Sequence, residues 1–213
     1  MDDYKIKTIE SYDKNAKNFA EYFKGLMDVP GRPEFNKFTG SLNGNKILDL
    51  GCGGGDHSVW FRDNGFEVSA VDLSEEMVKL AREKGVDARV IDIEDLKFEE
   101  NSFDGIWAVT SLLHVPKYKI KEVIRKLSLI LKPTGVLLVV LKEGDRENYV
   151  DDKNDTSSRA FLKNAGTKRY FVPYQKDEFL EYTKDSFELI DFWSQKPRNT
   201  NYLHFLFRNR KSA

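Results

Sequence analysis

Short apolar runs and amphipathic segments alternate along the chain from about residue 46 onward. A short apolar run bounded by turn residues is typical of a buried parallel strand, and apolar positions three and four residues apart predict a helix. We therefore expect buried strands over 46–50, 66–72, 88–92, 103–109 and 135–141. Helices are expected between them, around Val59, after an N-cap at Ser74, and from Tyr118. This alternation predicts an α/β fold, a Rossmann-like parallel sheet with helices on both faces.

The two ends of the chain depart from this alternation. The first 40 residues predict helical segments that share one apolar stripe: Tyr12, Ala16, Phe19, Ala20 and Phe23. Residues 142–174 are polar with little periodicity, which is typical of a lid or binding loop. Helical spacing returns over 177–183, and two strand patterns follow over 187–193 and 202–208. We expect a single domain made of a helical N-terminal cap (1–44), a core (45–142), a substrate or lid segment (143–174) and a C-terminal part (175–213).

The composition limits the classes of partner. The 213 residues are 40% hydrophobic and 32% charged, which is typical of one folded domain. A net charge of −1 gives no domain-wide positive field, so a nucleic-acid partner is not expected. The single cysteine and the spacing of the three histidines offer no metal cluster. Without a signal-peptide pattern or a membrane-length apolar run, we expect a cytoplasmic monomer or homodimer with no membrane partner.

A glycine cluster lies between the first expected strand and the first helix. Residues 49–55 read Asp-Leu-Gly-Cys-Gly-Gly-Gly, and glycines there bring backbone N–H groups close to a ligand. A dinucleotide fingerprint needs its third glycine where Asp56 stands, and the Gly-Lys-Ser/Thr ending of a Walker loop is absent. The spacing Asp-x-Gly-x-Gly-x-Gly instead resembles the first motif of class I S-adenosylmethionine-dependent methyltransferases.

Further features in a fixed order extend this resemblance over about residues 45–142. They are Asp72 at the end of the second strand, Asp92 at the end of the third, and the fourth strand. The passage over 131–135 into the fifth strand is similar as well. The resemblance implies a three-layer sandwich around a mostly parallel seven-stranded sheet, closed by a C-terminal antiparallel hairpin. It also implies S-adenosyl-L-methionine as the cofactor.

The resemblance assigns the cofactor contacts residue by residue. Asp72 would accept hydrogen bonds from both ribose hydroxyls, and Asp92 would accept the adenine amine while the backbone N–H of Ile93 meets a ring nitrogen. Leu73 and Met77 either press on the adenine or pack between helix and sheet, and both interpretations stay open. The other expected contacts lie on the glycine turn and beside it: Asp49, Gly51, Cys52, Gly53, His57 and Val109.

Two further side chains are candidates for the reacting end of the site. His114, just after the fourth strand, is the candidate catalytic base, with an anchoring role in its loop as the alternative. The spacing Tyr12-Asp13-x-x-Ala16 resembles the cofactor-covering helix of small-molecule methyltransferases, where an aromatic ring attracts a sulfonium. A helix that merely packs on the sheet is the other interpretation of Tyr12. His204 is expected to be structural.

We expect transfer of the methyl group of S-adenosylmethionine to an oxygen, nitrogen or carbon atom of a small molecule. In the polar segment, cationic residues alternate with aromatic ones, which favours an anionic acceptor, although such charges are usually solvated. The cationic residues are Arg159, Lys163, Lys168 and Arg169. We expect this segment and the N-terminal helix to form the acceptor pocket and close over the cofactor.

Rival functions stay open at this point. The missing third glycine disfavours a nicotinamide-dependent oxidoreductase, while a non-catalytic binding module would keep the same carboxylates. Residues 109–112, Val-Thr-Ser-Leu, lack the Asn/Asp-Pro-Pro-Tyr/Phe signature of enzymes that methylate nucleic-acid bases.

Overall fold

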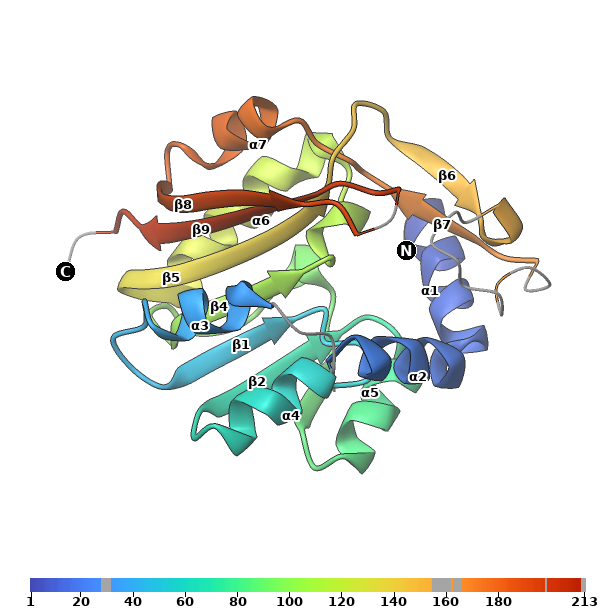
Figure 1. Cartoon of the computed structure of the whole chain (residues 1–213), viewed down its shortest axis with the longest axis horizontal. Helices are drawn as coiled ribbons and strands as arrows, with labels where there is room; N and C mark the ends of the chain where they lie inside the picture. Colours follow the sequence, from blue (N-terminus) through green and yellow to red (C-terminus); the bar gives the residue numbers. More distant parts are fainter. Residues whose placement is uncertain (28–31, 155–161, 163–165, 198, 212–213) are drawn as a thin grey trace.

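The computed structural model describes residues 1–27, 32–154, 162, 166–197 and 199–211 (Figure 1). Its main sheet has the strand order β3-β2-β1-β4-β5-β9-β8, in which β9 is antiparallel to both β5 and β8 and the other pairs are parallel. The strands are β1 (Lys46–Leu50), β2 (Glu67–Asp72), β3 (Asp87–Val90), β4 (Phe103–Val109), β5 (Leu131–Lys142), β8 (Phe187–Gln195) and β9 (Tyr202–Asn209). The predicted seven-stranded sheet with an antiparallel hairpin is confirmed.

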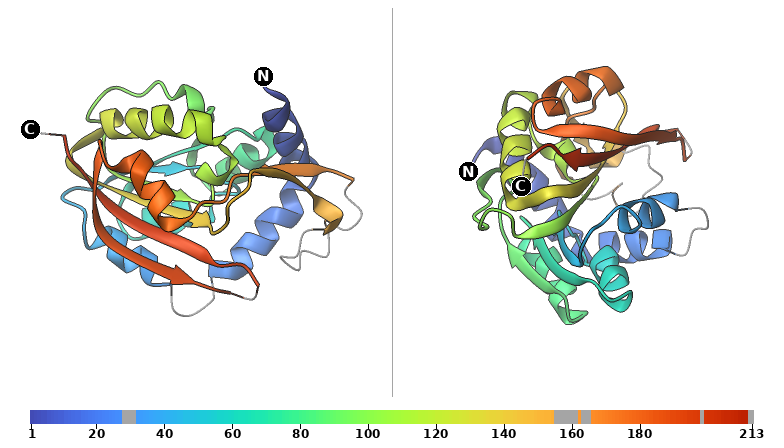
Figure 2. Two further views of the ribbon diagram at one scale, coloured as in Figure 1. Left: turned by 90° about the horizontal axis from the view of Figure 1, so that it is seen from above. Right: turned by 90° about the vertical axis from the view of Figure 1, so that its left-hand side faces the viewer.

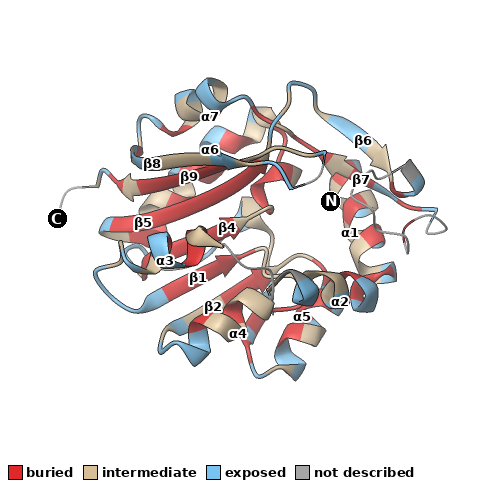
Figure 3. Cartoon of the chain, in the orientation of Figure 1, coloured by how far each residue is buried: buried red, intermediate tan, exposed pale blue. Residues whose placement is uncertain are grey.

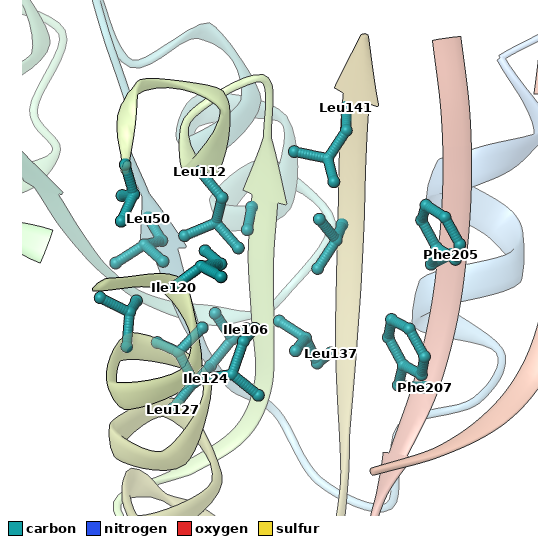
Figure 4. Close-up of a cluster of buried hydrophobic side chains, with 14 of the residues drawn as sticks. Leu50, Ile106, Leu112, Ile120, Ile124, Leu127, Leu137, Leu141, Phe205 and Phe207 are labelled. Atoms are coloured by element: carbon teal, nitrogen blue, oxygen red, sulfur yellow. The ribbon is translucent and has the colours of Figure 1, made fainter. Parts of the chain in front are cut away.

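Helices cover both faces of this sheet (Figure 2). The helices α3 (Pro33–Thr39), α4 (Asp56–Asp63) and α5 (Glu75–Glu83) pack on one face, and α6 (Lys117–Ile130) and α7 (Lys176–Thr183) on the other. On the second face, Ile120, Ile124 and Leu127 of α6 pack toward β4, β5 and β9 (Figure 4). Strands β4 and β5 are buried over most of their length (Figure 3), as their apolar sequences predict.

The N-terminal cap consists of α1 (Asp3–Lys14) and α2 (Ala16–Met27), which meet at Asn15. The predicted apolar stripe therefore continues across a break between two helices. Helix α1 lies beside a small ribbon, visible at the right of Figure 1, in which β6 (Asn148–Asp151) pairs antiparallel with β7 (Lys168–Phe171). No regular structure was predicted over 142–174, and this is wrong for β6 and β7. The ribbon was missed because β7 buries an arginine at a position where alternation predicts an apolar residue.

Two predicted strand boundaries are also wrong. Strand β3 ends at Val90, and Asp92 instead caps a short 3₁₀ helix, Ile93–Asp95, by accepting the backbone N–H of Glu94 at 2.9 Å. Strand β5 begins at Leu131, and its register with β4 shifts between Phe103 and Gly105, before the regular pairing resumes at Val136. No helix in the described parts of the chain is long and apolar enough to cross a membrane.

Candidate active site

A cavity lies at the carboxyl ends of the central strands, where the strand order reverses between β1 and β4. Ligands of doubly wound sheets bind at such a reversal. It encloses about 850 Å³ of empty space, including the part that opens to solvent. Most residues predicted from the sequence to contact the cofactor line its wall: Tyr12, Gly51, Gly53, Asp72, Leu73, Met77, Asp92, Ile93 and Val109. His114 lines it as well.

The glycine turn brings the backbone to the cavity wall. Gly51 and Gly53 have φ angles of 80° and 53°, a left-handed conformation that favours glycine. A Cβ atom at Gly51 would lie 2.3 Å from the Cβ atom of Ser111, so a larger residue would collide with the loop after β4. The hydroxyl of Ser111 is itself buried without a hydrogen-bond partner at this wall.

Asp72 at the end of β2 is held by backbone groups. Its Oδ2 accepts the N–H of Gly53 at 2.8 Å, and its Oδ1 accepts the N–H of Ser74 at 3.0 Å. Each carboxylate oxygen has further lone pairs, so the side chain is fixed while it still offers acceptors to the cavity. Burial raises the pKa of Asp72 above its usual value, and these two N–H groups counteract that rise.

Asp92 is engaged by the first turn of α1. Its Oδ2 accepts from the ammonium of Lys5 at 2.6 Å, and Lys5 also pairs with Glu94 at 2.7 Å. Lys119 of α6 adds a second cation on Glu94 at 2.7 Å, and the hydroxyl of Tyr4 donates to the same side chain. Tyr4, Lys5, Asp92 and Glu94 all line the cavity, so this network forms part of its wall. No sequence signal links Lys5 to Asp92, since the two are 87 residues apart.

His114 contacts two groups that fix its tautomer. Its Nδ1 lies 2.6 Å from the carbonyl oxygen of Tyr170, which can only accept, so Nδ1 carries the proton. In the neutral ring Nε2 is then the acceptor, and it lies 3.0 Å from the hydroxyl of Tyr12. Tyr12 and His114, predicted separately, therefore form a hydrogen-bonded pair at the cavity wall.

Three predicted cofactor residues lie away from the described lining of the cavity. Asp49 accepts the hydroxyl of Ser58 at 2.6 Å, and its burial raises the pKa to about 7. Cys52 packs against the small cluster between α5 and β2. The Nδ1 atom of His57 accepts a hydrogen bond from Trp107 Nε1 at 3.0 Å. Burial of the imidazole lowers the pKa of His57 to about 3. Their predicted contacts with the cofactor stay predictions.

Two of the four cationic residues predicted to favour an anionic acceptor lie among the described residues. Arg159 and Lys163 lie outside the described residues, and Lys168 is exposed. Arg169 is 1% exposed and pairs with buried Asp152 at 2.7 Å, so the alternative of a solvated charge does not apply to it. An arginine is tolerated there because its charge is compensated and its guanidinium lies 5.1 Å from the ring centroids of Phe19 and Phe171.

Comparison with known proteins agrees with this geometry. Residues 47–135 match the family model described as a methyltransferase domain. A ubiquinone biosynthesis O-methyltransferase from Xanthomonas oryzae pv. oryzae is 38% identical over 117 residues, which are 52% of this chain and 48% of the relative. The chain thus spans about half the length of the curated relatives it matches first.

Solved structures share the fold over a larger part of the chain. A SAM-dependent methyltransferase from Methanosarcina mazei matches with a TM-score of 0.70 and 17% identity, over 84% of this chain and 98% of that one. The 1,6-didemethyltoxoflavin-N1-methyltransferase of Burkholderia thailandensis matches with a TM-score of 0.64 and 21% identity, over 93% of this chain and 88% of that one. The match to a methyltransferase domain covers residues 47–135, and the sheet order agrees with the fold that these solved structures share with the chain.

Proposed function

We propose that this protein transfers the methyl group of S-adenosylmethionine to a small-molecule acceptor. The observation that carries this proposal is the position of Asp72, fixed by two backbone N–H groups at the wall of a cavity that the glycine turn also lines. A carboxylate so placed is suited to accept both hydroxyls of a ribose. The curated relatives that share the matched domain include an O-methyltransferase.

The residues at the wall fit this cofactor from end to end. Asp92 and the backbone of Ile93 hold the adenine, Leu73 and Met77 supply the apolar surface beside it, and Asp72 holds the ribose. Gly51 and the loop after β4 receive the methionine part, where the unpartnered Ser111 hydroxyl offers a hydrogen bond. The bound cofactor supplies an already activated methyl group on a sulfonium, so the protein mainly aligns the acceptor and excludes water.

Tyr12 and His114 form the base for an acceptor that carries an O–H or N–H group. The Nε2 atom of His114 is the basic position, and the Tyr12 hydroxyl stands beside it. As the acceptor atom forms its bond to the methyl carbon, its proton passes to the Tyr12 oxygen while the proton of Tyr12 moves to Nε2. The carbonyl of Tyr170 orients the ring and stabilises the imidazolium that results.

Calorimetric titration with S-adenosylhomocysteine and with NAD tests this function. We expect the first to bind and to raise the melting temperature, and the second to do neither. At a hundredfold excess over Kd, a ligand of the native state alone adds about 2.7 kcal/mol to the free energy of unfolding. Binding of NAD without S-adenosylhomocysteine would assign the cavity to an oxidoreductase instead. The cytoplasmic location, the anionic acceptor and the monomeric or homodimeric state stay predictions.

A further inference from the structure

A buried ion pair lies behind the hydrogen bond of Tyr12 with His114. Arg169 on β7 is 1% exposed, and its Nε donates to Asp152 Oδ1 at 2.7 Å. Asp152 is also 1% exposed, and it accepts two hydroxyl groups besides. A buried ion pair is a poor source of stability, because the cost of removing both charges from water offsets much of their attraction. The position of this pair therefore calls for an explanation besides stability.

The guanidinium of Arg169 packs among the rings around this hydrogen bond. Its Cζ atom lies 5.6 Å from the ring centroid of Tyr12 and 5.1 Å from those of Phe19 and Phe171. The ring centroid of Phe171 lies 5.0 Å from that of His114. Phe19 lies 4.8 Å from Tyr12 by the same measure. Because a guanidinium is planar and attracted to ring faces, Arg169 supports rings beside both partners of the hydrogen bond.

The backbone of β7 reaches the same histidine. Tyr170 lies between Arg169 and Phe171, and its carbonyl oxygen accepts from His114 Nδ1 at 2.6 Å. Its N–H donates to the hydroxyl of Thr8, which lines the cofactor cavity from α1. The side chains of Arg169 and Phe171 are both buried, so they anchor the backbone on either side of this carbonyl. The hydrogen bond at one ring nitrogen of a histidine determines which nitrogen carries the proton.

We propose that Arg169 is a positioning residue for methyl transfer, which acts through Tyr12 and His114. This inference rests on the proposed function. With Arg169 in place, the Tyr170 carbonyl keeps the proton of His114 on Nδ1, and Nε2 stays bare toward the Tyr12 hydroxyl. The guanidinium also holds the Tyr12 ring at the cavity wall. A histidine without such partners favours the tautomer that carries its proton on Nε2, and this nitrogen then accepts no proton from Tyr12.

Nitrogen NMR of the full chain, with isotope-labelled histidine side chains, tests this role without any ligand. The chain has three histidines, and His114→Gln identifies the signal of His114 by its loss. At about pH 9 a histidine is neutral, and we expect the wild type to carry the proton of His114 on Nδ1. Arg169→Met should shift the ratio of the two tautomers toward Nε2–H by at least about fivefold, the factor that one hydrogen bond controls.

Lys168→Met is the matched control, because Lys168 precedes Arg169 on β7 and its side chain is exposed. It should keep the wild-type tautomer of His114. If Arg169→Met does not fold, the double variant Asp152→Asn, Arg169→Met decides, because it removes both charges of the pair.

Methyl transfer to an acceptor that the wild type methylates gives a second readout. At saturating S-adenosylmethionine we expect kcat of Arg169→Met to fall at least about tenfold. Its combination with His114→Gln should be no slower than His114→Gln alone, because a positioning residue has no effect once the group that it positions is gone. An unchanged His114 tautomer, or additive losses in the combined variant, overturns the positioning role. Failure of S-adenosylhomocysteine to bind the wild type overturns the proposed function instead, and the NMR measurement still decides whether Arg169 orients His114.

Discussion

The ammonium of Lys5 lies 2.6 Å from Asp92 Oδ2, so α1 reaches the carboxylate that we assign to the adenine. Lys5 and Glu94 each have side chains only 12% exposed, and the pair joins α1 to the 3₁₀ helix beyond β3. A ligand that enters at this end must share Asp92 with Lys5 or displace it. The ion pairs of Lys5 with Asp92 and Glu94 therefore hold the first turn of α1 at the wall of the cofactor cavity.

Lys5→Met should make cofactor entry faster. Partly exposed ion pairs stabilise by up to about 1 kcal/mol, so we expect the association rate of S-adenosylhomocysteine to rise by up to about fivefold. Stopped-flow fluorescence at increasing salt measures this, and the wild-type rate should rise with salt while that of Lys5→Met changes less. Lys7→Met is the control, because Lys7 pairs with exposed Asp3 on the same helix. An unchanged rate in Lys5→Met would show that α1 does not limit entry.

Asp72→Ala should weaken cofactor binding far more than His114→Ala does. A ribose hydroxyl that loses a charged acceptor loses about 1.5–3 kcal/mol, which corresponds to about tenfold or more in Kd. Calorimetric titration of S-adenosylhomocysteine into both variants measures the difference, with circular dichroism to check folding. A correctly folded Asp72→Ala protein with wild-type affinity would remove Asp72 from the site.

Tyr12→Phe and His114→Gln should lower kcat together. General base catalysis contributes roughly 10²–10⁴-fold, so we expect losses of about a hundredfold in each variant with an unchanged Kd for S-adenosylhomocysteine. Formation of S-adenosylhomocysteine with an acceptor that the wild type methylates gives the rates. The double variant should be no slower than either single one, because the two side chains serve one proton transfer. Additive losses would show that they act separately.

Asp49→Asn should reduce the loss of stability at rising pH. Burial raises the pKa of Asp49 to about 7, from a usual value of 3.8, so the folded protein keeps a proton that the unfolded chain releases. The stability that this group contributes is complete below the unfolded pKa and is lost as the pH rises through the folded pKa. Between about pH 5 and pH 8 the wild type should lose on the order of 2 kcal/mol more than the variant. Urea unfolding at both pH values measures this, and parallel losses would contradict the raised pKa.

The sheet, Asp72 and the glycine turn could be predicted because each is indicated by residues that are adjacent in the sequence. Asp72 follows an apolar run directly, and the glycines at 51 and 53 mark a turn whatever the rest of the chain does. Such features need only neighbouring residues to be interpreted.

The rest of the site depends on pairs that are distant in the sequence. Tyr12 and His114 are 102 residues apart, and nothing in either segment predicts their hydrogen bond. The ion pair of Arg169 with Asp152 could not be predicted, because the two residues are 17 positions apart, beyond any helical or strand spacing. His57 lies beside the glycine turn as predicted, but one of its ring nitrogens accepts a hydrogen bond from Trp107.

The sequence also predicts a cover made of the N-terminal helix and residues 142–174, and the contacts of Asp152 explain how the two would move together. Asp152 accepts the hydroxyl of Ser11 on α1 at 2.5 Å and the guanidinium of Arg169 on β7 at 2.7 Å. The N–H of Tyr170 also donates to Thr8 on α1 at 3.0 Å. Because both elements share one buried carboxylate, opening one of them exposes the other.

Hydrogen exchange should therefore show α1, β6 and β7 as one cooperative unit that is slowed by S-adenosylhomocysteine. A lid belongs to the less stable parts of a fold, so these elements should exchange faster than β4 and β5 without ligand. Asp152→Ala removes a buried carboxylate from Arg169, from Ser11 and from Thr167, which costs roughly 3–5 kcal/mol, and should speed exchange in α1 and β7 equally. Asp151→Ala is the control, because the neighbouring Asp151 is partly exposed and pairs with Lys153 in the short 3₁₀ helix that follows β6. Exchange in α1 that does not change with ligand or with Asp152→Ala would mean that α1 is a fixed wall of the cavity.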